Sequence, residues 1–256
     1  MQYIDCKAYA QEILDEVKAV QNKKELYILT MGNNPASESY VKGKIKDCEY
    51  CGIPYTHIKC DTEESLQRHI FMGNCYKEVG GIIVQLPLPD SINEENCIDR
   101  IDPNKDVDGF KYDSEFWPCT PEGIMYVLEK ELGDLTGKKA LVIGRGKLVG
   151  TPIAPMLIDA NCTVTVAHSK TTNLDELLAC NDIIISAVGK PNTVDLSKCC
   201  VAKVVIDVGV NRDENGKLCG DCFNFNPNGM NIKVTPVPNG IGLMTRAMLM
   251  KHMSDV

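Results

Sequence analysis

The chain has 256 residues and a formal net charge of −8, with 44% hydrophobic and 24% charged residues. These values are typical of a soluble globular protein that is long enough for two domains. The acidic balance without a basic run argues against nucleic acid as the main partner, and no apolar run approaches the roughly 20 residues that span a bilayer. The N-terminus has no signal pattern, and 13 scattered cysteines do not form a disulfide framework. We therefore expect a cytoplasmic protein that binds neither nucleic acid nor membranes.

Short apolar runs alternate with amphipathic runs of helical length along almost the whole chain. The predicted strands are 26–31, 55–60, 81–85, 140–143, 163–167, 182–186, 204–207 and 232–235. The predicted helices are 6–20, 37–51, 65–75, 92–100, 121–132, 151–159, 174–179 and 243–253. Alternation of this kind predicts an α/β fold with parallel sheet covered on both faces.

The helix predicted over 37–51 carries a lysine in an unusual place. At about 100° per residue, Lys42 and Lys46 point toward water, whereas Lys44 falls on the apolar side, one turn after Tyr40. Such a lysine either extends to the surface or is held in a pocket. Because Tyr40 and Lys44 are four residues apart, both would face the same spot.

The strand predicted over 81–85 ends in a polar residue, Gln85. Three successive β-branched residues indicate burial on both faces, and Pro87 and Pro89 cannot extend the strand because proline has no N–H. Gln85 therefore lies at the carboxyl end of a buried strand, where open α/β sheets bind ligands. A buried amide needs a partner, since leaving it unpaired costs about 1–3 kcal/mol. A loop-capping role is the alternative.

Metal binding is an alternative for two groups of residues, and we predict none. Asp106 and Asp108 could chelate a cation, but the spacing lacks the rest of a calcium loop. Asp108 could instead accept hydrogen bonds from an amino-pyrimidine-like ring. The Cys-x-x-Cys pairs that begin at Cys48 and Cys219 could form a zinc site, although buried cysteines packing as small apolar groups are favoured.

The strand predicted over 140–143 runs into a glycine-rich turn. Gly144, Gly146 and Gly150 give a G-x-G-x-x-x-G spacing, one residue longer than the usual dinucleotide fingerprint. Such a turn brings backbone N–H groups and the positive end of the next helix to a phosphate. We therefore predict a dinucleotide site here.

The end of the next predicted strand favours NADP over NAD. About 20 residues after the turn, where a carboxylate would bind the ribose of NAD, the chain has His168 and Ser169. Together with Arg145 they offer the donors and charge that suit a 2′-phosphate, although a plain polar loop is the alternative. Two further loops follow apolar strands and would border the cofactor. Their candidate residues are Val188, Gly189, Gly209 and Val210.

A domain boundary is expected near 118–121, where a polar loop precedes a helix. Residues 1–119 would form a smaller α/β substrate domain, on which the helix 243–256 packs back, and 120–242 would form a Rossmann-type NADP-binding domain. A ligand cleft between the two is the expected arrangement. The segment before the last helix has the form of a binding loop, with a stiff Pro-x-Pro followed by glycines. Its candidate residues are Pro238, Asn239, Gly240, Ile241 and Gly242.

These segments together resemble the methylenetetrahydrofolate dehydrogenase/cyclohydrolase (FolD) family over nearly the whole chain. The matching motifs are Pro35-Ala36-Ser37…Tyr40-Val41…Lys44, Val84-Gln85-Leu86-Pro87-Leu88-Pro89, Lys105-Asp106-Val107-Asp108-Gly109, Pro118-Cys119-Thr120-Pro121…Gly123, Gly144-Arg145…Val149-Gly150…Pro152, His168-Ser169…Thr171, Asp207-Val208-Gly209, Gly220-Asp221 and Thr235-Pro236-Val237-Pro238.

The resemblance implies two reactions of one-carbon metabolism. 5,10-Methylenetetrahydrofolate is oxidised with NADP, and the methenyl product is hydrolysed to 10-formyltetrahydrofolate. The tetrahydrofolate derivatives would be bound by a homodimer. Because the chain ends at Val256, no fused formate–tetrahydrofolate ligase domain is expected.

The resemblance also implies roles for individual residues. Lys44 would transfer protons in the hydrolysis, and Gln85 would hold Lys44. Asp108 would bind the pterin edge, and Tyr40 would pack against the folate ring system. The remaining binding residues that it implies are Val84 and Leu86 for the substrate and Val149 for the cofactor.

The chain departs from the family pattern at two loops. The usual Pro-Gly-Gly-Val-Gly-Pro is Pro-Asn-Gly-Ile-Gly-Leu at 238–243; if position 239 needs a positive φ, asparagine is the best substitute for glycine. The usual serine after Arg145 is Gly146, which removes a hydroxyl near the cofactor phosphates. The alternatives to a bifunctional enzyme are a dehydrogenase without hydrolase activity, a non-catalytic NADP-binding protein and a shikimate-type dehydrogenase.

Overall fold

The computed structural model describes residues 1–225 and 231–256, which divide into two compact units. Unit 1 consists of Met1–Ala10 and Thr120–Thr245, and unit 2 of Gln11–Cys119 and Arg246–Val256. The chain therefore passes between the units three times. One passage lies between Cys119 and Thr120, and the other two lie inside helices α1 (Cys6–Ala19) and α8 (Ile241–Asp255).

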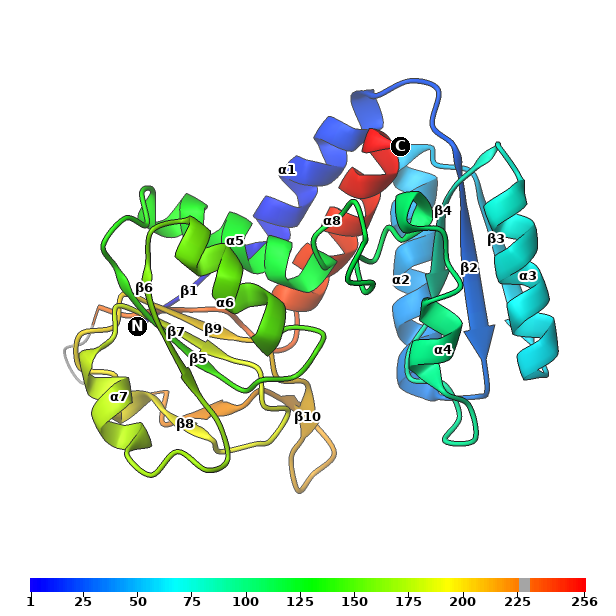
Figure 1. Ribbon diagram of the computed structural model, residues 1–256. Coiled ribbons are helices and arrows are strands. Elements are labelled where there is room, and N and C mark those ends of the chain that lie inside the picture. Colours follow the sequence, from blue (N-terminus) through cyan, green and yellow to red (C-terminus); the bar gives the residue numbers. More distant parts are fainter. Residues whose placement is uncertain (226–230) are drawn as a thin grey trace. The chain divides into compact units, whose positions relative to one another are not determined.

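Unit 1 is built on a six-stranded parallel sheet in the order β1-β13-β9-β7-β5-β6 (Figure 1). Its strands are β1 (Gln2–Tyr3), β5 (Lys139–Ile143), β6 (Thr163–Ala167), β7 (Ile183–Ser186), β9 (Val204–Asp207) and β13 (Lys233–Val234). Ile143 pairs with both Ala167 and Ser186, and Ser186 pairs with Asp207. The carboxyl ends of four strands therefore meet at one edge of the sheet, which is where such sheets bind ligands.

Strand β1 was not predicted. Its Gln2 and Tyr3 pair in parallel with Lys233 and Val234 of β13, at the edge of the large sheet. The domain prediction had placed residues 1–10 with the N-terminal half, whereas this pairing joins them to unit 1.

Helices cover both faces of this sheet, as the alternating pattern predicted. Helix α5 (Cys119–Leu132) precedes β5, α6 (Gly150–Asp159) follows β5, and α7 (Leu174–Cys180) follows β6. Leu178 of α7 packs with Leu141 and Ile184 in one buried cluster, while α6 packs on β5 and β6. Two pairs of short strands complete unit 1: β8 (Val194–Asp195) with β12 (Cys222–Phe223), and β10 (Asn211–Arg212) with β11 (Leu218–Cys219).

Unit 2 is built on a three-stranded parallel sheet in the order β3-β2-β4 (Figure 1). Its elements are β2 (Glu25–Met31), α2 (Pro35–Cys51), β3 (Tyr55–Cys60), α3 (Glu63–Cys75), β4 (Val79–Val84) and α4 (Glu94–Ile98). Successive residues of β4 face opposite sides. Ile82 lies 2.8 Å from the Cβ position of Gly73 in α3, whereas the Cβ position of Gly81 lies 2.5 Å from the sulfur of Met253 in α8. Both faces are therefore covered.

Local capping explains where the helices begin and end. Asn34 accepts hydrogen bonds from the N–H groups of Ala36 and Ser37, and Gly52 ends α2 with a φ of 67°. Helix α4 is shorter than the predicted 92–100, because Asn93 caps its start by accepting from the N–H of Asn96.

None of the 13 cysteines forms a disulfide bond. Within the described residues, no helix combines the length and the apolar character needed to cross a membrane.

Candidate functional site

Lys44 is buried on α2, with 3% of its surface exposed, while Lys42 and Lys46 are exposed. Its ammonium nitrogen lies 3.6 Å from Oδ2 of Asp108 and 5.4 Å from the ring centroid of Tyr40. Extension of Lys44 to the surface, the alternative left open by the sequence, is wrong. Burying two charges costs several kcal/mol per ion before they attract one another, so this pair is weak support for stability and points to function.

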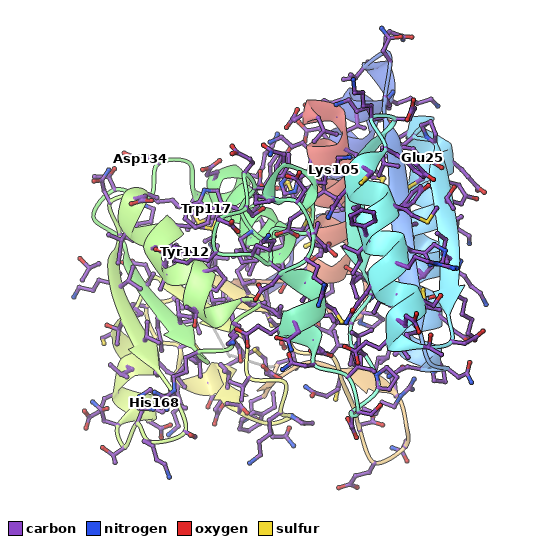
Figure 2. All side chains as sticks on the ribbon, turned by 45° about the vertical axis from the view of Figure 1, so that its right-hand side comes forward. Glu25, Lys105, Tyr112, Trp117, Asp134 and His168 are labelled. Atoms are coloured by element: carbon purple, nitrogen blue, oxygen red, sulfur yellow. The ribbon has the colours of Figure 1, made fainter. Side chains whose placement is uncertain are left out.

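The Asp108 loop is held by its backbone. Gly109 has a φ of +70°, and a Cβ there would lie 2.4 Å from the carbonyl oxygen of Trp117. The N–H of Cys119 donates to the Asp108 carbonyl at 3.2 Å. The side chains of Tyr112 and Trp117 in this loop are exposed (Figure 2). The close approach at Gly109 and the hydrogen bond from Cys119 hold the main chain at Asp108 in place.

The two carboxylates of this loop serve different partners. Asp106 is 1% exposed and accepts a hydrogen bond from the N–H of Lys111 at 2.8 Å, whereas Asp108 faces Lys44. Burial raises the pKa of Asp106, and the N–H of Lys111 acts against that shift. In the part of the chain that the structure describes, no three His, Cys, Asp or Glu side chains gather as a metal site.

Gln85 follows β4 directly, and its backbone N–H still bonds to the Leu29 carbonyl at 2.8 Å. Its side-chain nitrogen donates to the Leu86 carbonyl at 2.8 Å. Its Oε1 is buried and has no hydrogen-bond partner among the described residues. Gln85 therefore makes no hydrogen bond to Lys44, the residue that the family resemblance implies it holds. A buried oxygen without a partner suits a site that receives a donor from a ligand.

The neighbours of Gln85 differ in what they can offer. The side chain of Val84 packs in the core and is 2% exposed, so a ligand could contact this residue only through its backbone. The Leu86 carbonyl accepts a second hydrogen bond, from the hydroxyl of Ser37 at 3.3 Å. Sequence reasoning gave Ser37 no role.

The glycine turn after β5 leaves no room for side chains at two positions. A Cβ at Gly144 would lie 2.4 Å from the Ala187 carbonyl oxygen, and a Cβ at Gly150 would lie 2.3 Å from that of Gly144. Gly144 also has a φ of +111°. Val149 precedes α6 without a side-chain cap. The N–H of Thr151 already donates to the Gly146 carbonyl at 3.0 Å and Pro152 has no N–H, which leaves the N–H of Gly150 at the start of α6 for a phosphate. The turn therefore fits a dinucleotide.

Arg145 and Ser169 lie two residues beyond the paired Ile143 and Ala167, so neighbouring strands deliver both to the same edge. Both are exposed, and no carboxylate occupies residues 168–171. His168 has a local partner, because its Nδ1 accepts a hydrogen bond from the N–H of Lys170 at 3.2 Å.

Three of the remaining four cofactor candidates contact the same residue, Asp221, to which the sequence assigned no role. The N–H groups of Val188 and Gly189 both donate to the carboxylate of Asp221, and Gly209 packs against the same carboxylate. Val210 is exposed. The family resemblance had included Gly220-Asp221 without a role. No local pattern could reveal one, because the donors lie about 32 residues away in sequence.

The predicted loop 238–242 belongs to unit 1, whereas Lys44, Gln85 and Asp108 belong to unit 2. Asn239 has a φ of 70°, so the condition that made asparagine the best substitute for glycine is met. A Cβ at Gly240 would lie 2.1 Å from the Pro236 carbonyl oxygen, which explains why glycine is retained there.

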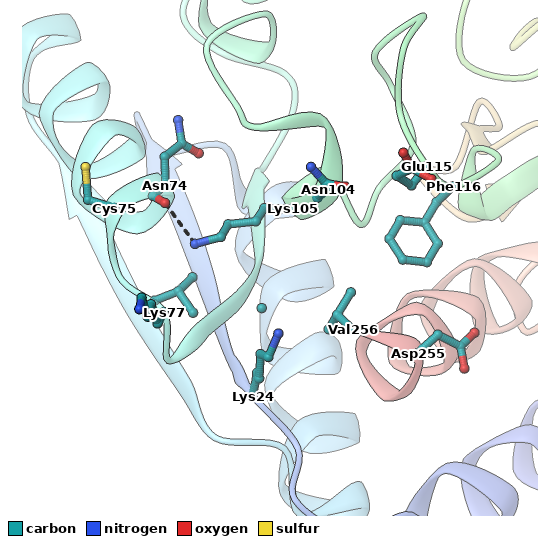
Figure 3. A pocket seen from close by; sticks show the side chains of 12 residues that line it. Lys24, Asn74, Cys75, Lys77, Asn104, Lys105, Glu115, Phe116, Asp255 and Val256 are labelled. Carbon is teal, nitrogen blue, oxygen red and sulfur yellow. Dashed lines mark hydrogen bonds between the residues drawn. The ribbon is translucent and has the colours of Figure 1, made fainter.

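A cavity of about 880 Å³ in unit 2 is formed by other residues (Figure 3). None of the predicted site residues lines it. Its Lys105 donates to the carbonyls of Gly73, Asn74 and Tyr76 at 2.8, 3.0 and 2.7 Å. Because these carbonyls end α3, Lys105 acts as a helix cap.

Comparison with known proteins identifies two domains of one family, which together cover most of the chain. Residues 4–108 match the model for the catalytic domain of tetrahydrofolate dehydrogenase/cyclohydrolase, and residues 118–256 match the model for its NAD(P)-binding domain. The bifunctional protein FolD of Agathobacter rectalis is 41% identical over 268 residues, covering 97% of this chain and 96% of that protein.

Solved structures agree. The crystal structure of bifunctional FolD from Campylobacter jejuni has a TM-score of 0.91 and 38% identity, covering 98% of this chain and 96% of that one. FolD from Trypanosoma brucei, complexed with NADP cofactor and inhibitor, has a TM-score of 0.89 and 29% identity, covering 98% and 95%. The chain therefore belongs to the tetrahydrofolate dehydrogenase/cyclohydrolase family.

Proposed function

We propose that this chain oxidises 5,10-methylenetetrahydrofolate with NADP and hydrolyses the methenyl product to 10-formyltetrahydrofolate. The observation that most supports the proposal is the burial of Lys44 in this chain, where its ammonium group lies next to Asp108 and the ring of Tyr40. The family assignment rules out the alternative of a shikimate-type dehydrogenase.

In the oxidation, the protein's task is to align two rings, because NADP, when bound, supplies the hydride acceptor. The turn from Gly144 to Gly150 would hold the pyrophosphate at the start of α6. Arg145 and Ser169 would bind the 2′-phosphate that distinguishes NADP from NAD. The absence of a carboxylate from residues 168–171 supports this preference.

In the hydrolysis, water adds to the methenyl carbon and the bond from that carbon to N5 breaks. Because the methenyl group is a cation and the formyl product is neutral, the water loses both of its protons: one is taken up by N5 and the other leaves to solvent. Lys44 would move the proton that reaches N5, and its burial keeps the ammonium group in place. Asp108 would bind the pterin edge, Tyr40 would pack on the ring system, and the unpaired oxygen of Gln85 would accept a donor from the bound folate or water.

We also propose that unit 2, which consists of Gln11–Cys119 and Arg246–Val256, is the substrate domain, and that unit 1 binds the cofactor. We further propose that the protein works in the cytoplasm as a homodimer. Its 13 cysteines without a disulfide bond support a reducing compartment, and its net charge of −8 supports a small-molecule substrate over nucleic acid. The homodimer rests on the family resemblance.

A spectrophotometric assay tests the proposed activities. Purified protein is given methylenetetrahydrofolate with NADP or with NAD, and methenyltetrahydrofolate is followed as it forms and decays. We expect formation to be faster with NADP at equal concentration, followed by decay. Persistent methenyltetrahydrofolate would indicate a dehydrogenase without hydrolase activity, and no formation would indicate a non-catalytic binding protein. Faster turnover of NAD would contradict the roles of Arg145 and Ser169.

Gly146→Ser should lower the KM for NADP about two- to tenfold, the effect of one added hydrogen bond. A Cβ at Gly146 meets nothing within 4 Å, so the hydroxyl enters open space without strain. The measurement is the KM for NADP in the dehydrogenase assay. Gly146→Ala is the matched control, because it fills the same space without a hydroxyl; an equal gain from alanine would rule out a contact between the serine and a phosphate.

A further inference from the structure

Two buried carboxylates lie behind the cofactor edge of unit 1. Asp207, at the end of β9, is 2% exposed, and Asp221 is 0% exposed. Every hydrogen bond that the structure gives to their carboxylates comes from a backbone N–H or a neutral side chain. Burying a carboxylate costs free energy unless hydrogen-bond donors surround it. We therefore asked which part of the structure these two carboxylates hold in place.

Asp207 fixes the main chain at Asp221. Its Oδ1 accepts from the N–H groups of Gly209 and Asp221 at 3.1 and 2.9 Å, and its Oδ2 accepts from that of Cys222 at 2.9 Å. A Cβ at Gly220 would lie 2.0 Å from Asp207 Oδ2, so only glycine allows this approach. The backbone that carries Asp221 is thereby anchored to the end of a sheet strand.

Asp221 in turn holds the loop that follows β7. Its Oδ2 accepts from the N–H groups of Val188 at 3.0 Å and Gly189 at 3.2 Å, and its Oδ1 accepts from that of Lys190 at 2.9 Å. Two side chains complete the set at 2.9 Å each, the hydroxyl of Ser186 and the amide of Asn211. Three consecutive N–H groups on one carboxylate leave this loop little freedom.

The loop 187–190 packs directly against the glycine turn that begins at Gly144. The Ala187 carbonyl oxygen lies 2.4 Å from the Cβ position of Gly144. Loosening the loop from 187 to 190 would therefore move the surface that sets the shape of the dinucleotide turn. The chain of contacts runs from Asp207 through Asp221 and the loop to Gly144.

We propose that Asp221 is a positioning residue for NADP, which acts through the backbone of residues 188–190 and does not touch the cofactor. The inference rests on the proposed function, because it assumes that the cofactor site of this family operates in this chain. It assigns Asp221 to the dehydrogenase reaction and not to the hydrolysis, which needs no nicotinamide.

Asp221→Asn tests the proposal with little change in size. The amide nitrogen replaces one acceptor oxygen with a donor, so N–H groups meet an NH₂ group. We expect the KM for NADP to rise about tenfold or more, with a smaller change in kcat, and kcat/KM for dehydrogenation to fall at least about tenfold more than that for hydrolysis of methenyltetrahydrofolate. Asp175→Asn, at an exposed carboxylate on α7, is the control for charge loss.

A purely structural role would lower thermal stability and reduce both activities by the same factor. That outcome, or an unchanged KM for NADP, would overturn the proposal.

If Asp221→Asn does not fold, Ser186→Ala tests the proposal by removing one of the five donors to the Asp221 carboxylate. It should raise the KM for NADP about threefold. An unchanged KM in that variant would overturn the proposal. Calorimetric titration with NADP separates this result from the proposed function. A wild-type protein without folate activity would contradict the proposed function. The ratio of the NADP affinities of wild type and Asp221→Asn would still test the role of Asp221.

Discussion

Replacing Lys44 with methionine should lower the rate of methenyltetrahydrofolate hydrolysis by about 10²–10⁴-fold, the usual contribution of a positioned proton-transfer group. Methionine retains the unbranched shape of the side chain but removes the ammonium group that lies 3.6 Å from Asp108. The measurement is the decay of methenyltetrahydrofolate without any nicotinamide, with circular dichroism to verify the fold.

The helix itself supplies the control for this experiment. Lys42→Met makes the same chemical change one half-turn away on α2, where the side chain is exposed, and it should leave hydrolysis near the wild-type rate. Removing one partner of a buried ion pair also destabilises a protein by about 3–5 kcal/mol, so Lys44→Met should unfold at a lower temperature than Lys42→Met. Full hydrolase activity in folded Lys44→Met would reject the role assigned to this lysine.

Gly144→Ala should lower kcat/KM for NADP-dependent dehydrogenation by about 10²-fold or more, because a displacement of about 1 Å can cost that much in a positioned reaction. The added methyl would lie 2.4 Å from the Ala187 carbonyl oxygen, and its backbone φ of +111° is one that alanine rarely adopts. The turn must shift, and the backbone that would hold the pyrophosphate shifts with it. The measurement is methenyltetrahydrofolate formation at a series of NADP concentrations.

Gly146→Ala tests whether the effect comes from the collision and not from the loss of glycine. It adds the same methyl group two residues along, where nothing lies within 4 Å. We expect dehydrogenation in this variant to stay within about threefold of wild type. Equal losses in the two variants would mean that the turn is sensitive to any side chain, and the steric argument would fail.

The sequence was most informative where a side chain's environment follows from regular local structure. Helical spacing was enough to place Lys44 on the buried side of α2, and a β-branched run ending at two prolines was enough to place Gln85 at a strand end. Glycine spacing next to a strand located the turn at Gly144. In each case, the residues that decide the outcome lie within one or two turns of the chain.

The rest depended on contacts between distant segments. Strand β1 has two residues, too few for any periodicity, and it exists because β13 offers an open edge. The role of Asp221 depends on N–H groups that only the folded loop brings together. Likewise, the unpaired oxygen of Gln85 is known only once Leu86 has taken the amide nitrogen.

The three passages of the chain between the units bear on how this protein could be taken apart or recombined. A piece ending at Cys119 would lack Met253, whose sulfur packs where β4 has only a glycine. A piece starting at Thr120 would expose the edge of β13 that β1 normally occupies, inviting aggregation. Swapping one half for that of a relative at a single crossover would therefore give chimaeras with mismatched termini. Exchange should succeed only when the first ten and last eleven residues follow the units to which they belong.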